Sequence, residues 1–222
     1  MKIIARIRTS FNEKFGIPRQ SGIVEGATGE IVFEPEFRNE QALRGIEGYS
    51  HLWIIWQFSE AQRDEWSPTV RPPRLGGNKR MGVFATRSPY RPNPIGLSSV
   101  KLVSVNRTKD GVTLTVSGID MLDGTPIYDI KPYLSFTDSH PEAVCGFADD
   151  VKDYSIEVSF PDDLLQKIDE GQRQSLIEIL SHDPRPSYKN HKDEDNEYGM
   201  SYGKYEIKFR VENNVLVVTD VN

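Results

Sequence analysis

The 222-residue sequence predicts a mainly β protein: an antiparallel β-barrel core followed by a small C-terminal α+β appendage. In several segments of the first 140 residues, apolar side chains alternate with polar ones at period two, the pattern of half-buried strands. Only one segment of this region has a helical pattern, which disfavours a parallel sheet with crossover helices. The pattern changes near residue 150. We therefore divide the chain into a barrel domain, residues 1–150, and a C-terminal domain, residues 151–222.

Strands account for most of the predicted barrel domain. Residues 3–8 alternate between two faces, and residues 52–58 are apolar on both faces, as expected of a central strand. Residues 100–105 and 112–116 flank Asp110-Gly111, a dipeptide that favours a tight hairpin turn.

Helices are expected at three places. Residues 39–46 carry apolar side chains at helical spacing behind Asn39, a good N-cap. In the C-terminal domain, residues 161–180 predict two short amphipathic helices separated by Gly171. A hairpin with Asn213-Asn214 at its turn should follow.

One stretch of the chain reverses the sign of its charge. The sequence holds 33 acidic and 27 basic residues, yet no acidic residue lies between Glu65 and Asp110. Nine basic residues do: Arg71, Arg74, Lys79, Arg80, Arg87, Arg91, Lys101, Arg107 and Lys109. Pro and Gly are frequent between residues 71 and 97, which places the first of these cations on shaped loops. This pattern favours an anion-binding surface over a merely solubilising loop, and a net charge of −6 argues against general coating of nucleic acid.

Several classes of protein fit poorly. No apolar run is long enough to cross a membrane and no signal peptide opens the chain, so we expect a cytoplasmic protein without membrane association. The single Cys145 excludes an intrachain disulfide, and we expect it to be a small buried hydrophobe. Phosphate-binding glycine loops and a nucleophilic serine elbow are both missing.

A second dense motif surrounds the turn at residues 123–126. Asp120, Asp123 and Asp129 place three carboxylates beside this turn. Asp123 alone could simply cap turn backbone. The three together lack the fuller oxygen-ligand pattern of a calcium loop, so we predict no metal.

Eight motifs, spread nearly end to end, resemble those of the TrmO (YaeB, TsaA-like) family. They are residues 15–22 (FGIPRQSG), 49–53 (YSHLW), 71–77 (RPPRLGG), 82–89 (GVFATRSP), 91–96 (RPNPIG), 123–126 (DGTP), 129–133 (DIKPY) and 183–186 (DPRP). The resemblance implies a β-barrel, homodimeric enzyme that uses S-adenosylmethionine to methylate threonylcarbamoyl-adenosine, the modified purine 3′ of the anticodon in certain tRNAs. Carried over by motif, the implied cofactor contacts are Pro18, Arg19, Gln20, Phe58, Ser59, Arg87, Leu97, Asp123, Gly124, Thr125 and Pro126.

The residues suggest roles within such a reaction. Arg and Lys bind phosphate, and aromatic rings stack on splayed bases of an anticodon loop. The candidates for RNA contact are Arg71, Arg74, Lys79, Arg80, Tyr90, Arg91 and Arg185. Asp120 or Asp123 could accept the proton of the attacking nitrogen, and Arg87 or Arg91 could hold the threonyl carboxylate.

Two other readings stay open. The same barrel could bind S-adenosylmethionine or RNA as a sensor that transfers nothing. Alternatively, the Arg-Pro loops could dock an acidic protein partner.

Overall fold

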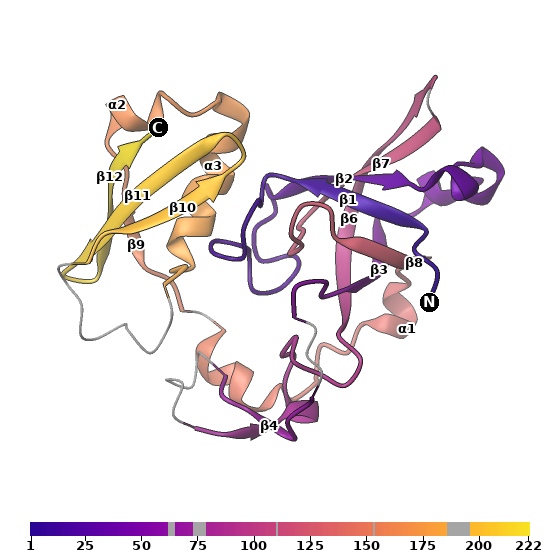
Figure 1. The fold of residues 1–222 in the computed structure, drawn as a ribbon, viewed down its shortest axis with the longest axis horizontal. Helices are drawn as coiled ribbons and strands as arrows, with labels where there is room; N and C mark the ends of the chain where they lie inside the picture. Colours follow the sequence, from indigo (N-terminus) through magenta and orange to yellow (C-terminus); the bar gives the residue numbers. More distant parts are fainter. Residues whose placement is uncertain (62–64, 73–78, 110, 153, 186–195) are drawn as a thin grey trace.

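A computed structural model of the chain describes residues 1–222 except 62–64, 73–78, 110, 153 and 186–195. Six strands form a closed barrel in the order β1-β2-β7-β6-β3-β8, and all neighbouring strands are antiparallel (Figure 1). The strands are β1 (Ala5–Thr9), β2 (Thr28–Phe33), β3 (His51–Gln57), β6 (Ile95–Thr108), β7 (Gly111–Ser117) and β8 (Pro126–Pro132). β4 (Thr69–Val70) and β5 (Met81–Gly82) pair separately. The predicted barrel is confirmed.

Alternating side chains fill the barrel interior. Leu52, Ile54 and Trp56 of β3 point inward and are buried, while the residues between them are half-buried or exposed. β7 shows the same alternation, with Val112, Leu114 and Val116 buried. Fully burying one such aliphatic side chain stabilises the fold by roughly 1.5–3 kcal/mol. β3 lies between β6 and β8, so its predicted central place is confirmed, as is the β6–β7 hairpin. Asp110, in the turn of the β6–β7 hairpin, lies outside the described residues.

The helix predicted over residues 39–46 is wrong in type. The segment forms two 3₁₀ helices, η2 (Glu40–Leu43) and η3 (Ile46–Gly48). Asn39 caps the first as expected, because its side chain accepts a 2.9 Å hydrogen bond from the backbone N–H of Gln41. Gly45 then adopts a left-handed φ of 90°, which ends the helical path. The other short helices among the described residues of this part are η1 (Pro35–Phe37), η5 (Val83–Ala85), α1 (Ser135–Asp138) and η6 (Gly146–Val151).

In its described residues, the C-terminal part is a four-stranded sheet with two helices. Its strand order is β10-β11-β12-β9, with β9 (Glu157–Ser159), β10 (Tyr198–Tyr202), β11 (Tyr205–Glu212) and β12 (Val215–Val221). Asn213 and Asn214 have φ values of 49° and 63°, so the predicted hairpin turn is confirmed. The helices are α2 (Asp162–Leu165) and α3 (Glu170–Ser181). The two predicted helices are present, but the prediction that Gly171 separates them is wrong. Gly171 lies in the first turn of α3, and residues 166–169 separate the helices.

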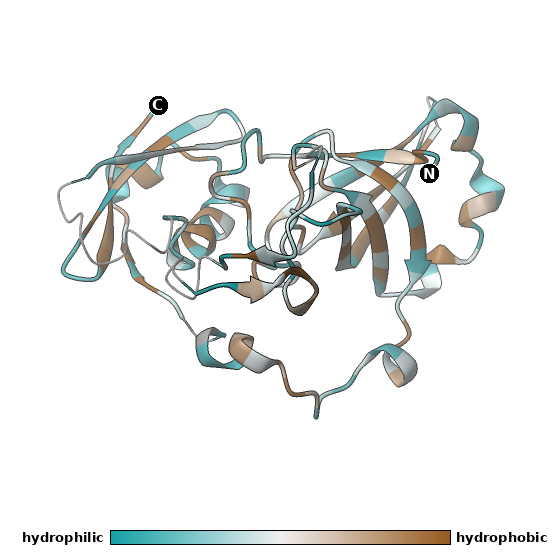
Figure 2. Cartoon of the chain, turned by 60° about the horizontal axis from the view of Figure 1, so that its bottom comes forward, coloured by the Kyte–Doolittle hydropathy of each residue, from teal (hydrophilic) through white to brown (hydrophobic). Residues whose placement is uncertain are grey.

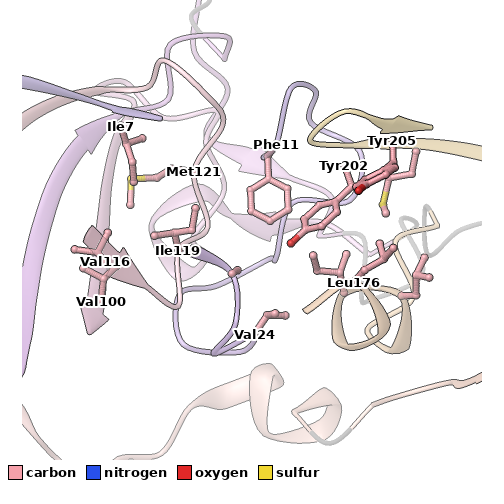
Figure 3. Packing of buried hydrophobic residues seen from close by; sticks show 14 of the residues in the cluster. Ile7, Phe11, Val24, Val100, Val116, Ile119, Met121, Leu176, Tyr202 and Tyr205 are labelled. Carbon is pink, nitrogen blue, oxygen red and sulfur yellow. The ribbon is translucent and has the colours of Figure 1, made fainter. Parts of the chain in front are cut away.

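The two parts share one hydrophobic cluster. The loop between β1 and β2, residues 10–27, lies between the barrel and the C-terminal sheet (Figure 1). Phe11 and Val24 of this loop face Tyr202 and Leu176 of the C-terminal part (Figure 3). The ring centroids of Phe11 and Tyr202 are 5.9 Å apart. A boundary at residue 150 stays a prediction, because the shared cluster does not by itself mark one.

Two glycines allow this close approach. A Cβ atom on Gly16 would overlap with Sδ of Met200, and one on Gly26 would overlap with Oγ of Ser175. Residues 133–156 connect the parts along a separate route, as a strap that carries α1 and η6 and runs from the barrel to the C-terminal sheet (Figure 2). Across the described parts of the chain, no helix is long and apolar enough to cross a membrane.

Candidate active site

One end of the barrel gathers the segments that carry most of the predicted site residues. β1, β3 and β7 end there, and their antiparallel neighbours β2, β6 and β8 begin there, as the pairs Thr9↔Gly29, Gln57↔Ile95 and Trp56↔Ile127 show. The loops after β1, β3 and β7 and the segment before β6 therefore meet at this end. Their described residues are 10–27, 58–61, 65–68, 118–125 and 83–94.

Asp120 lies in the loop after β7 and is held by a short relay. Oγ of Ser98 donates a 2.6 Å hydrogen bond to Oδ1 of Asp120. Nε1 of Trp56 in turn donates a 2.9 Å hydrogen bond to Oγ of Ser98, which is completely buried. Burial raises the pKa of Asp120 to about 6; hydrogen bonds from Ser98 and from the backbone of Asp120 and Ser21, and the charge of Arg87, oppose that rise. A carboxylate with a pKa near 6 is suited to take up a proton near neutral pH.

Arg87 and Gln20 are connected to this carboxylate through their neighbours and through charge: Gln20 precedes Ser21, whose backbone hydrogen-bonds to Asp120, and the charge of Arg87 acts on the same carboxylate. Nη1 of Arg87 donates a hydrogen bond to Oε1 of Gln20, and Nε2 of Gln20 donates to the carbonyl oxygen of Arg19. Arg87 is exposed, and both side chains line a cavity of about 1690 Å³. The guanidinium is therefore available to an anionic group that enters this cavity.

The cavity has basic and aromatic walls. Its lining includes Arg71, Arg80 and Tyr90, and it also includes Trp66 and Phe84, whose ring centroids are 6.1 Å apart. Trp66 is 54% exposed and Phe84 is 72% exposed, which is unusual for large aromatic side chains on a solvent-facing loop. Exposed rings beside guanidinium groups provide stacking surfaces together with phosphate contacts.

The other predicted RNA contacts differ in their surroundings. Lys79 is exposed beside β5, and Arg74 lies outside the described residues. Arg91 lines the cavity, but its Nη1 donates to the carbonyl oxygens of Thr86 at 2.8 Å and Val83 at 3.4 Å, so it holds its own loop together. Arg185 is only 5% exposed and pairs with Asp183 at 2.8 Å. This burial argues against the predicted contact between Arg185 and RNA.

The predicted cofactor residues outside the turn at residues 123–126 lie on several segments at this end of the barrel. Phe58 packs on Trp56 with ring centroids 4.3 Å apart, and Ser59 and Leu97 are exposed at the same end of the barrel. Pro18 is buried. Arg19 lines the cavity, although its Nη2 also donates to two carbonyl oxygens of the C-terminal part.

The turn at residues 123–126 is tied to the barrel. Oδ1 of Asp123 accepts a 2.8 Å hydrogen bond from the backbone N–H of Thr9, so the carboxylate caps β1 and not its own turn. The N–H groups of Asp123, Gly124 and Thr125 all donate to carbonyls, of the β1–β2 loop, of β1 and of the residue before the turn respectively, and Thr125 and Pro126 are buried. A ligand at the protein surface could therefore bind this turn mainly at Oδ2, the second carboxylate oxygen of Asp123.

These residues fit S-adenosylmethionine in kind. The cofactor needs an apolar surface for adenine and polar groups for its ribose and amino acid ends. Leu97, which is 58% exposed, and Phe58 supply apolar surface, while Gln20, Arg87 and Asp123 supply donors and acceptors. Within the described ranges, no three His, Cys, Asp or Glu side chains gather in a way that could hold a metal.

Sequence reasoning missed several members of the site. Ser98 is one of them, because its link to Trp56 and Asp120 depends on pairing between distant strands. Trp66 and Phe84 could have been noticed, because both are large aromatic residues within the acid-free stretch. The expectation that Cys145 is buried is wrong: it is exposed, because the strap at residues 133–156 lies away from the shared core.

Comparison with known proteins finds matches that cover most of the chain. Residues 6–139 match the model of the tRNA-methyltransferase O N-terminal domain, and residues 153–222 match that of the TrmO C-terminal domain. The tRNA (adenine(37)-N6)-methyltransferase of Escherichia coli K12 is 42% identical over 214 residues, which cover 94% of this chain and 91% of the relative. The enzyme of the same name from Eikenella corrodens is 43% identical over 78% of this chain and 97% of its own length. A crystal structure of TrmO from Pseudomonas aeruginosa superposes with a TM-score of 0.79 at 32% identity, covering 99% of this chain and 94% of that one. The chain belongs to the TrmO family.

Proposed function

We propose that this protein transfers a methyl group from S-adenosylmethionine to the exocyclic N6 nitrogen of threonylcarbamoyl-adenosine at position 37 of tRNA. The chain is a tRNA methyltransferase of the TrmO family, whose relatives are named for methylation at adenine 37. A 46% identical relative from Pseudomonas aeruginosa carries a name that refers to S-adenosylmethionine-dependent methyl transfer. The observation that supports the proposal most is the half-buried Asp120, with a pKa of about 6, whose carboxylate is held by Ser98 and by the backbone of Ser21. Gln20, which precedes Ser21, and Arg87 line the basic, aromatic cavity.

The proposed reaction needs one proton acceptor. When bound, S-adenosylmethionine supplies a methyl group that its sulfonium sulfur has already activated, and the electron pair of the broken C–S bond stays on sulfur. N6 forms the new C–N bond and loses its proton, which Asp120 accepts. The hydrogen bond from Ser98 fixes the carboxylate, and the pKa near 6 leaves it ionised at neutral pH. Orientation of the two reactants should provide most of the remaining acceleration.

Substrate selection is assigned to the cavity. The threonyl group of the modified base carries a carboxylate, and Arg87 offers an exposed guanidinium whose charge also acts on Asp120. Trp66, Phe84 and Tyr90 provide stacking surfaces for bases of the anticodon loop, and Arg71 and Arg80 provide phosphate contacts. An unmodified adenosine at position 37 would leave Arg87 without its anionic partner.

We also propose that the protein works as a homodimer. Ile95 and Val103 of β6 expose 38% and 54% of their surface, and both lie on the outside of the barrel. A second copy that covers this strand would bury them. Light scattering on the purified protein should give twice the mass of one chain; the mass of a single chain would contradict the dimer.

A single assay tests the reaction and its substrate together. Purified protein is incubated with labelled S-adenosylmethionine and tRNA from cells that do or do not make threonylcarbamoyl-adenosine, and nucleosides are analysed by mass spectrometry. The expected result is label on the threonylcarbamoylated nucleoside alone. Label on unmodified adenosine would overturn the substrate assignment, and cofactor binding without any transfer would favour the sensor reading.

A further inference from the structure

The turn after α3 is a rigid, buried unit of the C-terminal part. Nε and Nη2 of Arg185 donate hydrogen bonds of 2.8 Å and 2.9 Å to the two carboxylate oxygens of Asp183. Oη of Tyr154, from the strap, donates a 2.9 Å hydrogen bond to Oδ2 of Asp183. Burial opposes ionisation of Asp183, but the hydrogen bonds and charge of Arg185 outweigh it and keep the pKa of Asp183 below its ordinary value. Both side chains therefore stay charged, and the two-point pairing fixes the backbone between them.

This turn presents its carbonyl groups to the barrel. Nη2 of Arg19 donates to the carbonyl oxygens of Asp183 at 3.1 Å and Arg185 at 3.2 Å. Asp183 adopts a left-handed φ of 49°, which is uncommon for a residue other than glycine. The direction of its carbonyl group thus depends on the pairing that holds this backbone.

Arg19 is followed by two residues that reach the candidate active site. The side chain of Gln20 accepts a hydrogen bond from Arg87, and the backbone of Ser21 hydrogen-bonds to Asp120. Three consecutive residues therefore connect the C-terminal turn, the guanidinium and the carboxylate. A displacement of Arg19 would be transmitted to its neighbours through a single peptide unit on each side.

The start of the same loop is held by the same domain. The N–H of Gly203 donates a 2.7 Å hydrogen bond to the carbonyl oxygen of Ser10, and Asn12 donates back to Gly203 at 2.8 Å. Phe11 packs on Tyr202 between these contacts (Figure 3). Residues 10–21 are therefore fixed at both ends by the C-terminal domain.

We propose that the C-terminal domain is a positioning element for methyl transfer, in which Asp183 and Arg185 set the place of the Arg19–Ser21 segment and, through it, of Arg87 and Asp120. This inference rests on the proposed function. It assigns to Arg185 a role at a distance from substrate, in place of direct contact with RNA. Errors of about 1 Å in the placement of catalytic groups can lower rates by roughly 100-fold, so a modest shift of this segment has a measurable effect.

The experiment uses the full chain with two variants and a control. Arg185→Met removes the ion pair at similar volume, and Tyr154→Phe removes one hydrogen bond to Asp183. Arg210→Ala is the control, because it breaks an exposed pair with Glu212 in the same domain. Methyl transfer gives kcat and the KM for S-adenosylmethionine, and amide hydrogen exchange is followed at residues 19–21 and in β3 and β7.

Arg185→Met should lower kcat/KM by roughly 10- to 100-fold, and exchange at residues 19–21 should become faster while β3 and β7 stay protected. Tyr154→Phe should change both readouts in the same direction by roughly twofold to fivefold, and it carries the test if Arg185→Met does not fold. Combined with Gln20→Ala, Arg185→Met should add less than it does alone, because both act on one segment.

Unchanged exchange at residues 19–21 in both variants would overturn the inference, whatever happens to activity. Full additivity with Gln20→Ala would also overturn it. If the unaltered protein transfers no methyl group to any tRNA, the proposed function fails. The exchange measurement then still decides whether Arg185 positions the segment.

Discussion

Ser98 and Asp120 form a 2.6 Å hydrogen bond at the end of the barrel where the site loops meet, with the serine hydroxyl as donor. The serine is buried in β6, and the carboxylate follows β7. The pair thus fixes an ionisable group on rigid barrel elements, which is the arrangement expected of a proton acceptor.

Replacement of Asp120 should separate chemistry from binding. Asp120→Asn keeps the shape and an acceptor for Ser98 but cannot take up a proton, so we expect kcat to fall by about 10²- to 10⁴-fold. The dissociation constant for S-adenosylmethionine, measured by calorimetry, should stay nearly unchanged. Asp129→Asn is the matched control, because its side chain can still accept from the backbone N–H of Ile130. Similar turnover in both variants would remove Asp120 from its role.

The rate of methyl transfer should depend on the ionisation of Asp120. The base works only when deprotonated, so kcat/KM should fall as the pH drops below about 6. Ser98→Ala removes a hydrogen bond that lowers the pKa of Asp120, and the acid limb should therefore move to higher pH. Ser99→Ala on the neighbouring half-buried position is the control and should leave the limb in place. An acid limb that Ser98→Ala does not move would assign the titration to another group.

The raised pKa of Asp120 also has a cost in stability. Because the folded-state pKa lies above that of an unfolded Asp, the stabilisation from the protonated form is complete below about pH 4. It is lost as the pH rises through about 6. Asp120→Asn should therefore unfold with a free energy about 1–3 kcal/mol higher than the unaltered protein at pH 8, and the difference should shrink near pH 4. Urea unfolding at the two pH values measures this; equal stability at pH 8 would mean that Asp120 is well solvated.

Two arginines of the cavity should account for part of the salt dependence of tRNA binding. Arg71→Ala with Arg80→Ala removes two phosphate contacts, so the slope of log K against log salt should become shallower by about 1–2. Filter binding at several salt concentrations provides the slopes. Lys204→Ala with Arg210→Ala removes the same charge from the C-terminal sheet, where both residues form exposed pairs. Equal slopes in the two double variants would place the RNA elsewhere.

Exposed aromatic rings can be compared inside and outside the cavity. Phe84 lines the cavity, whereas Phe136 is 86% exposed in α1 and does not. Phe84→Ala should weaken tRNA binding by about 1–3 kcal/mol, the usual effect of removing one stacked base. Phe136→Ala should leave it unchanged. A larger loss from Phe136→Ala would point to α1, outside the cavity, as the RNA-binding surface.

The period-two pattern was enough to predict the barrel, because its strands bury one face each. Val112, Leu114 and Val116 show this plainly, since every second side chain is inside. Local patterns could not predict what Arg185 contacts: the sequence presents a cation between two prolines, and only the folded turn buries it on Asp183. The contact from Arg19 to this turn joins residues 164 positions apart, and no local signal encodes it.

The absence of a Cβ atom at Gly16 and Gly26 restricts which C-terminal domains can pack against this barrel. Each glycine leaves room for one residue of the C-terminal domain, Met200 or Ser175. A barrel that carries any larger residue at either position would not accept this C-terminal domain without rearrangement. The two domains are therefore not interchangeable modules: a chimera between relatives should keep its full activity only when the contact residues on both sides come from the same parent.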